Sequence, residues 1–461
     1  MSVLPSRSSI AAAPSRWWSQ RSQILTSVAV VCFVVLFFEA SADVLPDGTL
    51  FWLITPSRLV LIIGLAALLL AGGRVTDWST WLDVPLIALI ALSAWASRGS
   101  EAAMAQFRWF LTGVGMFLLT VCLLRRNADN RRLVLWSAFV GAAVAGLAGV
   151  RQWAAEQSTG FCRAPGASMA DGCERPGAMI RVAGSFFNPN LLAAFLVLVL
   201  PLAWVAAVKV QDRLLRLASL TVAAMTTLAL VLTWSRGAFV AFAAGALVFF
   251  LASRPTRNRL IATGAVLLVG ALALPEAIAS TRGPGVRVDL WGAALSIAGR
   301  HPFGIGLGNA GPAITAQVVD GRDYQHAHNL WLNWFVEAGW LGGLAVVALT
   351  VVLLLKLIDA GRRGSLYSGA LGAGMTGFLI LSLADHPANL TRIAMTAWVL
   401  VAAIMTLPGT QLPTWSQLLG WSGRDRQKAT EDQPESEPGL SDVGLADDEA
   451  SEAKRDQAVH V

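Results

Sequence analysis

Long apolar runs constrain this chain more than any other feature. About twelve stretches of roughly 20 residues are rich in Ala, Leu, Val and Gly, and a helix needs about that length to cross a bilayer core of about 30 Å. The runs lack period-2 alternation, which favours helices over an outer-membrane barrel. The sequence predicts an all-α polytopic membrane protein with spans at 24–41, 51–71, 82–97, 106–124, 133–152, 187–208, 214–233, 237–253, 259–275, 330–355, 366–384 and 390–407.

The distribution of charge divides the chain into three parts. Only 14% of residues are charged, against about 25% in average soluble domains, yet residues 423–461 hold eleven acidic and five basic side chains. We predict a cytoplasmic N-terminal segment at 1–23, a transmembrane domain at 24–420 and a disordered acidic cytoplasmic tail at 421–461. The basic excess of the transmembrane domain indicates membrane orientation and contact with phosphate, not binding of nucleic acid.

Basic residues gather in alternate connections between the predicted spans, and they set the expected orientation. These connections contain Arg16, Arg125, Lys209, Arg254 and Lys356, and the positive-inside rule places them in the cytoplasm. An even number of spans then puts both termini in the cytoplasm. Two long connections, 153–186 and 276–329, become periplasmic, and the second is the expected place for a functional site.

The predicted outer face carries arginine but no lysine. Its arginines are Arg163, Arg175, Arg181, Arg236, Arg282, Arg287, Arg300 and Arg322, whereas all four lysines fall on the cytoplasmic side. Arginine suits planar, bidentate capture of phosphate or carboxylate. A general preference of the genome for arginine is the alternative, because the cytoplasmic connections are also rich in arginine.

Two motifs place an arginine beside the start of an apolar run. In the first, Arg181 precedes Asn188, Pro189 and Asn190, a combination that suits an anion at a helix N-terminus. Ordinary capping by Asn188 or Asn190 is the alternative, but it leaves Arg181 unexplained. In the second, Arg236 interrupts two apolar stretches, where it is either functional, paired or a turn residue that reaches toward water.

A third motif runs from Arg287 through Trp291 and Arg300 to Asn309. Residues 288–299 read as a short amphipathic helix that lies on the membrane. The glycines that follow, at 304, 306 and 308, lack the strand, helix and lysine of a nucleotide-binding loop. They predict a turn in which the backbone approaches another segment closely.

The fourth motif holds the best candidate for acid–base chemistry. His326, His328 and Asn329 open a predicted span, and a histidine titrates near operating pH. An interfacial or capping histidine is the alternative. Two histidines at this spacing suit a metal, but no cysteine or carboxylate cluster completes the set, so we predict neither a metal nor a cofactor.

Arg58 and Arg392, toward the predicted outer half, are expected to pair with Asp385, Glu337 or lipid phosphate, and His386 is a further titratable group on that face.

The four cysteines fall into two kinds. Cys32 and Cys122 lie within apolar spans and are expected to be packing residues. Cys162 and Cys173 share one polar connection. If that connection is periplasmic, a disulfide and a pair of free thiols are both open possibilities.

In their order and spacing, the four motifs resemble the O-antigen ligase/polymerase superfamily. The resemblance covers about 181–355. It rests on Gly184 with Asn188-Pro189-Asn190, Ser235-Arg236-Gly237, Arg287 and Trp291 with His301-Pro302, Gly304, Gly306 and Asn309, and His328-Asn329 with Glu337, Gly339 and Gly342.

The resemblance implies a metal-independent, inverting glycosyltransferase in the bacterial inner membrane. Its donor would be an undecaprenyl-diphosphate-linked glycan, and its acceptor lipid A–core at the periplasmic face. His328 would activate or orient the acceptor hydroxyl, and Arg236, Arg287 and Arg181 would bind the donor diphosphate. The supporting residues expected around them are Asn188, Asn190, His326, Asn329 and Arg300.

Other functions remain open on the sequence. Members of the superfamily also include O-antigen or exopolysaccharide polymerases and protein O-oligosaccharyltransferases, which differ in the acceptor. A transporter or flippase is the alternative from a different class, and it predicts inverted repeats, which the two halves of the sequence do not show clearly.

Overall fold

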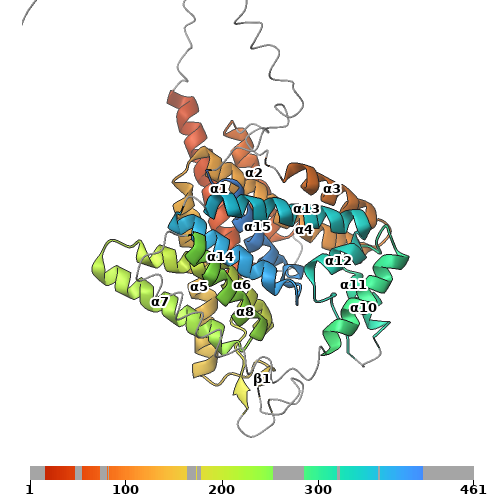
Figure 1. Cartoon of the computed structure of the whole chain (residues 1–461). Helices are drawn as coiled ribbons and strands as arrows, with labels where there is room; N and C mark the ends of the chain where they lie inside the picture. The colour runs from red at the N-terminus through yellow and green to blue at the C-terminus, as the bar shows by residue number, and fades with distance from the viewer. Residues whose placement is uncertain are drawn as a thin grey trace, which may run out of the picture. The chain divides into compact units, whose positions relative to one another are not determined.

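The computed structural model describes residues 16–46, 54–72, 80, 82–163, 173, 178–252, 285–318, 322–361 and 364–408. Within these residues the regular structure is almost entirely helical (Figure 1). The exception is a two-stranded antiparallel sheet of β1 (Cys162–Arg163) and β2 (Met179–Ile180), in which Cys162 pairs with Ile180. The predicted span 259–275 and the acidic tail 421–461 lie outside the described residues.

The helices of the first half are α1 (Arg16–Ala42), α2 (Pro56–Leu70), α3 (Asp83–Ala96), α4 (Glu101–Arg126), α5 (Asn130–Ala154), α6 (Pro189–Val208), α7 (Arg213–Leu232) and α8 (Arg236–Ala252). Those of the second half are α10 (Gly285–Arg300), α11 (Ala310–Thr315), α12 (Leu330–Glu337), α13 (Gly339–Gly361), α14 (Leu366–Leu381) and α15 (Thr391–Met405), with a short 3₁₀ turn at Pro387–Asn389.

Six of the described helices are long and apolar enough to cross a membrane: α1 from Gln20, α4, α5, α6, α7 and α13. Five more, α2, α3, most of α8, α14 and α15, are apolar but shorter. The all-α membrane class predicted from the sequence agrees with this pattern. The predicted total of twelve spans is not confirmed.

One predicted span is interrupted. Residues 330–355 were expected to form a single helix, but α12 ends at Glu337 and α13 begins at Gly339. Gly339 has φ +74°, and a Cβ added there would overlap the carbonyl oxygen of Pro302. The break therefore exists because the loop after α10 presses against the backbone at this point, and only glycine fits both conditions.

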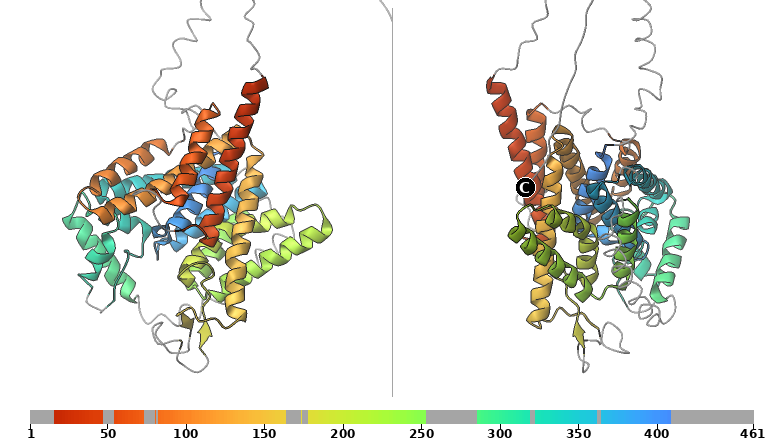
Figure 2. Two further views of the ribbon diagram at one scale, coloured as in Figure 1. Left: turned by 180° about the vertical axis from the view of Figure 1, so that it is seen from behind. Right: turned by 60° about the vertical axis from the view of Figure 1, so that its left-hand side comes forward.

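Close helix contacts hold α14 in the centre of the bundle (Figures 1 and 2). A Cβ added at Gly374 would overlap the Leu198 carbonyl of α6, and one added at Gly245 of α8 would lie 2.5 Å from the Ala373 carbonyl oxygen. Small residues at helix contacts are the usual means of close packing in membranes. The middle of α14 is thus held from two sides, and the candidate site follows the C-terminal end of this helix.

Candidate active site

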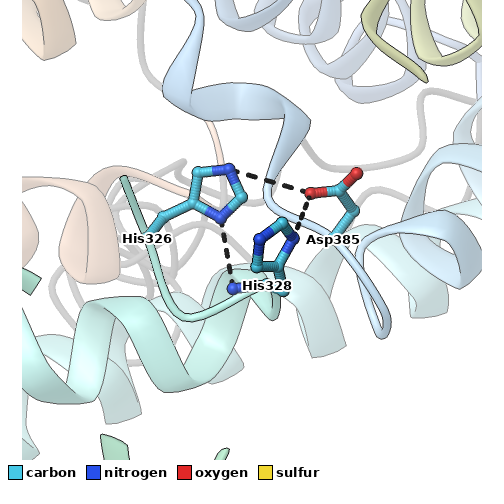
Figure 3. A group of neighbouring side chains, drawn as sticks. All are labelled: His326, His328 and Asp385. Carbon is cyan, nitrogen blue, oxygen red and sulfur yellow. Dashed lines mark hydrogen bonds and ion pairs between the residues drawn. The ribbon is translucent and has the colours of Figure 1, made fainter. Parts of the chain in front are cut away.

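A cluster of two histidines and one carboxylate forms where the loop before α12 meets the turn after α14 (Figure 3). The Nδ1 atom of His328 lies 3.1 Å from Oδ1 of Asp385. The Nε2 atom of His326 lies 3.8 Å from the same oxygen. The side chain of His328 is the most accessible of the three, at 29% exposed, against 13% for His326 and 15% for Asp385.

The charge of Asp385 fixes the proton positions on His328. Burial alone would raise the pKa of this carboxyl, but the hydrogen bond and positive charge of His328, the charge of His326 and the His386 amide lower it to about 2. The carboxylate is then ionised at neutral pH and can only accept hydrogen bonds. Nδ1 of His328 must therefore carry the proton, and in the neutral ring Nε2 presents a lone pair.

The two neighbouring histidines are neutral. Burial, and next the charge of His328, lower the pKa of His326 to about 4 against the opposing effect of Asp385. Burial, and next the charge of His326, lower the pKa of His386 to about 3. Nδ1 of His326 accepts a hydrogen bond from the backbone N–H of His328 at 3.1 Å, so His326 braces the loop that carries His328.

Three connections fix the backbone around His328. The indole N–H of Trp291 in α10 donates to the His328 carbonyl at 3.2 Å. The Asn329 side chain caps α12 by accepting from the Leu332 amide at 3.0 Å, and its amide group donates to the Leu383 carbonyl at 3.0 Å. His328 itself has φ +47°, a conformation that costs energy in a residue other than glycine and is frequent at functional sites.

A layer of buried polar groups lies behind this loop. The carbonyl oxygen of the Asn333 side chain accepts from the Ala327 amide at 3.1 Å. The Glu337 carboxylate accepts from the Ala310 amide at 3.4 Å, and its carbonyl accepts from Gly306 at 3.0 Å. Gly304, Gly306 and Gly308 all have positive φ. The close backbone approach predicted for these glycines is confirmed at Gly304, where an added Cβ would overlap the Glu337 carbonyl and the Gly339 amide, whereas Gly308 meets the Gln106 side chain.

Arg236 and Arg181 lie next to each other, but in different surroundings. Arg236 is exposed at the start of α8. Arg181 is buried, and its guanidinium donates to the Thr233 carbonyl and to the Asn190 side chain, both at 2.8 Å. Burial, and next the charge of Arg236, lower the pKa of Arg181 to about 10, so it remains cationic. Arg181 thus anchors the turn that presents Arg236.

The turn between α7 and α8 leads toward the histidine cluster. Gly237 packs so closely on α14 that an added Cβ would lie 3.0 Å from the Leu381 side chain. The C-cap residue of α14, Ser382, accepts a hydrogen bond from the Leu330 amide at 3.0 Å through its carbonyl. The turn that carries Arg236 therefore packs on the end of α14, and that end is hydrogen-bonded to the start of α12 beside His328.

The arginines of α10 differ in their relation to His328. Arg287 is exposed and lies one helical turn before Trp291, so the two residues share a helix face. Arg300 is exposed at the other end of α10, about 14 Å along the axis from Trp291, and its Nε donates to the Ser296 carbonyl at 3.3 Å. Arg287 thus lies on the part of α10 that contacts the His328 backbone through Trp291, and Arg300 lies at the far end of the helix.

Asn188 has a structural explanation in its hydrogen bonds. It is the N-cap of α6, and its side chain accepts from the Asn190 amide at 2.8 Å. Asn190 in turn binds Arg181. The capping alternative therefore accounts for Asn188, and the anion pocket expected at this helix start is occupied by contacts within the protein.

An apolar cavity of about 170 Å³ adjoins the cluster through His386. Its walls include Phe110 and Trp334, whose rings meet edge to face at 5.3 Å, and Trp398. Glu337 and Asn389 add polar groups to its lining. Such a cavity suits a chain of apolar atoms whose polar end lies beside the histidines.

The side chains of His326, His328 and Asp385 also have the spacing of a metal-binding group, with ligand atoms all within 4.8 Å of one another. Asp385 supplies the carboxylate that the sequence analysis did not find beside the two histidines. The expectation of a metal-independent site stays a prediction.

Two further predictions concern residues around the site. Cys162 and Cys173 form a disulfide, with their Cα atoms 4.9 Å apart. Arg392 does not use Asp385 or Glu337 in its described ion pair: it contacts Asp43 at 2.9 Å and stacks over Phe186. Arg58 approaches the Thr112 hydroxyl at 3.4 Å.

The second, third and fourth motifs lie within one segment of the chain, and this segment matches a known protein family. Residues 220–347 match the O-antigen ligase family. The predicted resemblance is confirmed for this segment, which extends from α7 into α13 and contains Arg236, Arg287 and His328. The motif at 181–190 and the residue Asp385 lie outside the match. No curated protein matches the chain.

Asp385 and Asn333 were not among the residues predicted from the sequence to form the site. Asp385 is 57 residues from its partner His328, so no local spacing connects them. Its one signal was the Asp385-His386 pair at the end of an apolar run on the predicted outer face. Asn333 gave a weaker signal, as a polar residue within a predicted span.

Proposed function

We propose that this protein transfers a glycan from undecaprenyl diphosphate to lipid A–core, at the periplasmic face of the bacterial inner membrane. The observation that carries the proposal is the His328–Asp385 pair, which leaves one ring nitrogen of His328 as an acceptor, in a chain with a match to the O-antigen ligase family. The proposal requires no nucleotide, cofactor or metal.

The chemistry follows from the positions of the charged groups. The acceptor hydroxyl attacks the anomeric carbon of the first sugar of the glycan, on the side opposite the diphosphate, so the configuration inverts. Nε2 of His328 takes the hydroxyl proton, and Asp385 stabilises the imidazolium that forms. The bond from the anomeric carbon to the diphosphate oxygen breaks, and undecaprenyl diphosphate leaves with the electron pair.

Arginines balance the charge that develops on the leaving group. Arg236 and Arg287 are exposed on two elements that flank the histidine cluster, and guanidinium groups bind phosphate oxygens bidentately. Arg181 acts through Arg236, because its own hydrogen bonds hold the preceding turn. The apolar cavity beside His386 accepts part of the polyprenyl chain or an acyl chain of the acceptor.

The periplasmic orientation has independent support. A disulfide between Cys162 and Cys173 is typical of an oxidising compartment, and Arg181 on the same connection belongs to the proposed site. Basic residues at the opposite helix ends favour the cytoplasm. Both termini are proposed to lie there.

Complementation tests the function and separates it from its alternatives. One strain lacks its O-antigen ligase and another its O-antigen polymerase, each with a compatible glycan pathway, and lipopolysaccharide is resolved on a gel. We expect wild type, and not His328→Ala, to restore capped lipopolysaccharide in the first strain. Recovery of a ladder only in the second strain would instead show a polymerase. No recovery in either, despite normal membrane expression, would favour protein glycosylation or transport.

A further inference from the structure

A second cavity, lined by polar side chains, lies at the end of α14 opposite the histidine cluster. It has a volume of about 350 Å³. Three cations line it: Arg131 and Arg132 from the first turn of α5, and Lys209 at the C-cap of α6. Asp129 is the acidic residue in the same lining. Two sequence segments that are far apart thus bring their basic residues to one space.

The first turn of α14 completes the lining with hydroxyl groups. Ser365 caps the helix by accepting from the Ser368 amide at 3.0 Å, and both serines line the cavity. Tyr367, in the same turn, also lines it. Its side chain is 7% exposed, and its hydroxyl has no hydrogen-bond partner among the described residues. Buried hydroxyls are nearly always bonded, and a ligand oxygen in the cavity would give this one a partner.

These groups share a preference for one ligand chemistry. Cationic side chains, the N-terminus of a 16-residue helix and a hydroxyl donor together suit a phosphate group. The net excess of cations over the single carboxylate favours an anion over a zwitterion.

The position of the cavity indicates which kind of molecule would supply the phosphate group. It opens where α5 begins and α6 ends, and both helices are candidate membrane spans. Leu135 and Leu407 line it beside the charges. The length of α14, about 24 Å, separates it from Asp385, so the two sites lie near opposite membrane surfaces. Basic pockets between helix ends on the cytoplasmic side are typical binding places for anionic lipid headgroups.

We propose that this cavity binds the phosphate of an anionic phospholipid headgroup from the leaflet opposite the candidate active site. The phosphate lies between Arg131, Lys209 and the α14 N-terminus, and Tyr367 donates its hydroxyl to a phosphate oxygen. The apolar part of the lipid continues past Leu407 into the bilayer. This proposal needs only that the helical bundle lies in a membrane, and it is independent of the transfer reaction.

Thermal unfolding of the whole protein in lipid nanodiscs tests the proposal without an activity assay. Nanodiscs of phosphatidylcholine are compared with nanodiscs that also contain phosphatidylglycerol, and inorganic phosphate is added to the former in a third arm. The variants are Arg131→Gln, Lys209→Gln and Tyr367→Phe. Arg213→Gln is the matched control, because Arg213 is an exposed arginine at the same end of the bundle but outside the cavity lining.

We expect phosphatidylglycerol to raise the Tm of wild type and Arg213→Gln by several degrees. Arg131→Gln and Lys209→Gln should lose most of this shift, and Tyr367→Phe part of it. In native mass spectrometry, loss of one cation should weaken retention of phosphatidylglycerol about tenfold. An equal response to inorganic phosphate, with the same dependence on the variants, would keep the phosphate site and refute the lipid as its source. An equal lipid shift in all proteins would overturn the proposal.

Discussion

Replacing Asp385 by asparagine removes the charge beside His328 but leaves the size of the side chain almost unchanged. Asparagine can turn its amide N–H₂ group toward Nδ1 of His328, which favours the opposite tautomer and puts the proton on Nε2. In that state His328 has no lone pair directed away from residue 385. The variant should therefore lose base catalysis while His328 remains in place.

The size of the effect follows from the electrostatics of the pair. Interactions in the cluster lower the pKa of Asp385 from its ordinary 3.8 to about 2, even though burial opposes this change. One pKa unit corresponds to about 1.36 kcal/mol, so the carboxylate is stabilised by roughly 2 kcal/mol. Because the imidazolium formed in the reaction depends on that carboxylate, Asp385→Asn should lower kcat about 30-fold or more.

The assay measures glycan transfer by purified protein from a diphosphate-linked donor, over a range of pH. Asp323→Asn is the control, because Asp323 is an exposed carboxylate a few residues before His326. The base mechanism would be refuted by an Asp385→Asn variant with wild-type kcat, or by a His328→Ala variant that transfers the glycan at the wild-type rate.

Three more predictions test the surroundings of the site. Arg236→Gln should lower kcat/KM for the donor about 10- to 100-fold through the loss of a charge-assisted contact, whereas the exposed Arg151→Gln should not. Gly304→Ala should lower the Tm by several degrees or prevent folding, because Gly304 has φ +80° and an added Cβ would overlap the Glu337 carbonyl. In contrast, Gly292→Ala in α10, which has open space around it, should be neutral or stabilising by about 0.5–1 kcal/mol. His386 has a pKa lowered to about 3 from 6.5, so the unfolded state binds more protons in that window, and stability should fall as pH decreases from about 6.5 to about 3. His386→Gln should flatten this slope, and an unchanged slope would contradict the assignment of a buried neutral histidine.

The apolar runs predicted most helices because each run carries its own signal along the sequence. The end of α12 could not be predicted in this way, because Gly339 breaks the helix in response to the backbone at Pro302. The same reason applies to Asp385, since only the folded chain brings it to His328 from 57 residues away. Local motifs are enough to predict His328 as a candidate, but its partner Asp385, and therefore its proton arrangement, depends on tertiary packing.

Arg181 shows a different limit of the sequence. An arginine beside a helix start predicts a contact with oxygen atoms. The sequence pattern does not tell whether those oxygens belong to a bound phosphate or to the protein. In the structure the oxygens belong to Thr233 and Asn190. These oxygens are neutral, so the anion expected at Arg181 is replaced by contacts within the protein, and Arg236 is the exposed member of the pair.

Reconstitution of wild type and His328→Ala in nanodiscs, with an undecaprenyl-diphosphate glycan and lipid A–core, tests the proposed transfer reaction. Wild type should form glycosylated lipid A–core with inverted configuration and release undecaprenyl diphosphate in equal amount. His328→Ala should bind the donor but form neither product. Wild type that binds donor and acceptor without forming a new glycosidic bond, or a His328→Ala variant as active as wild type, would contradict the proposal.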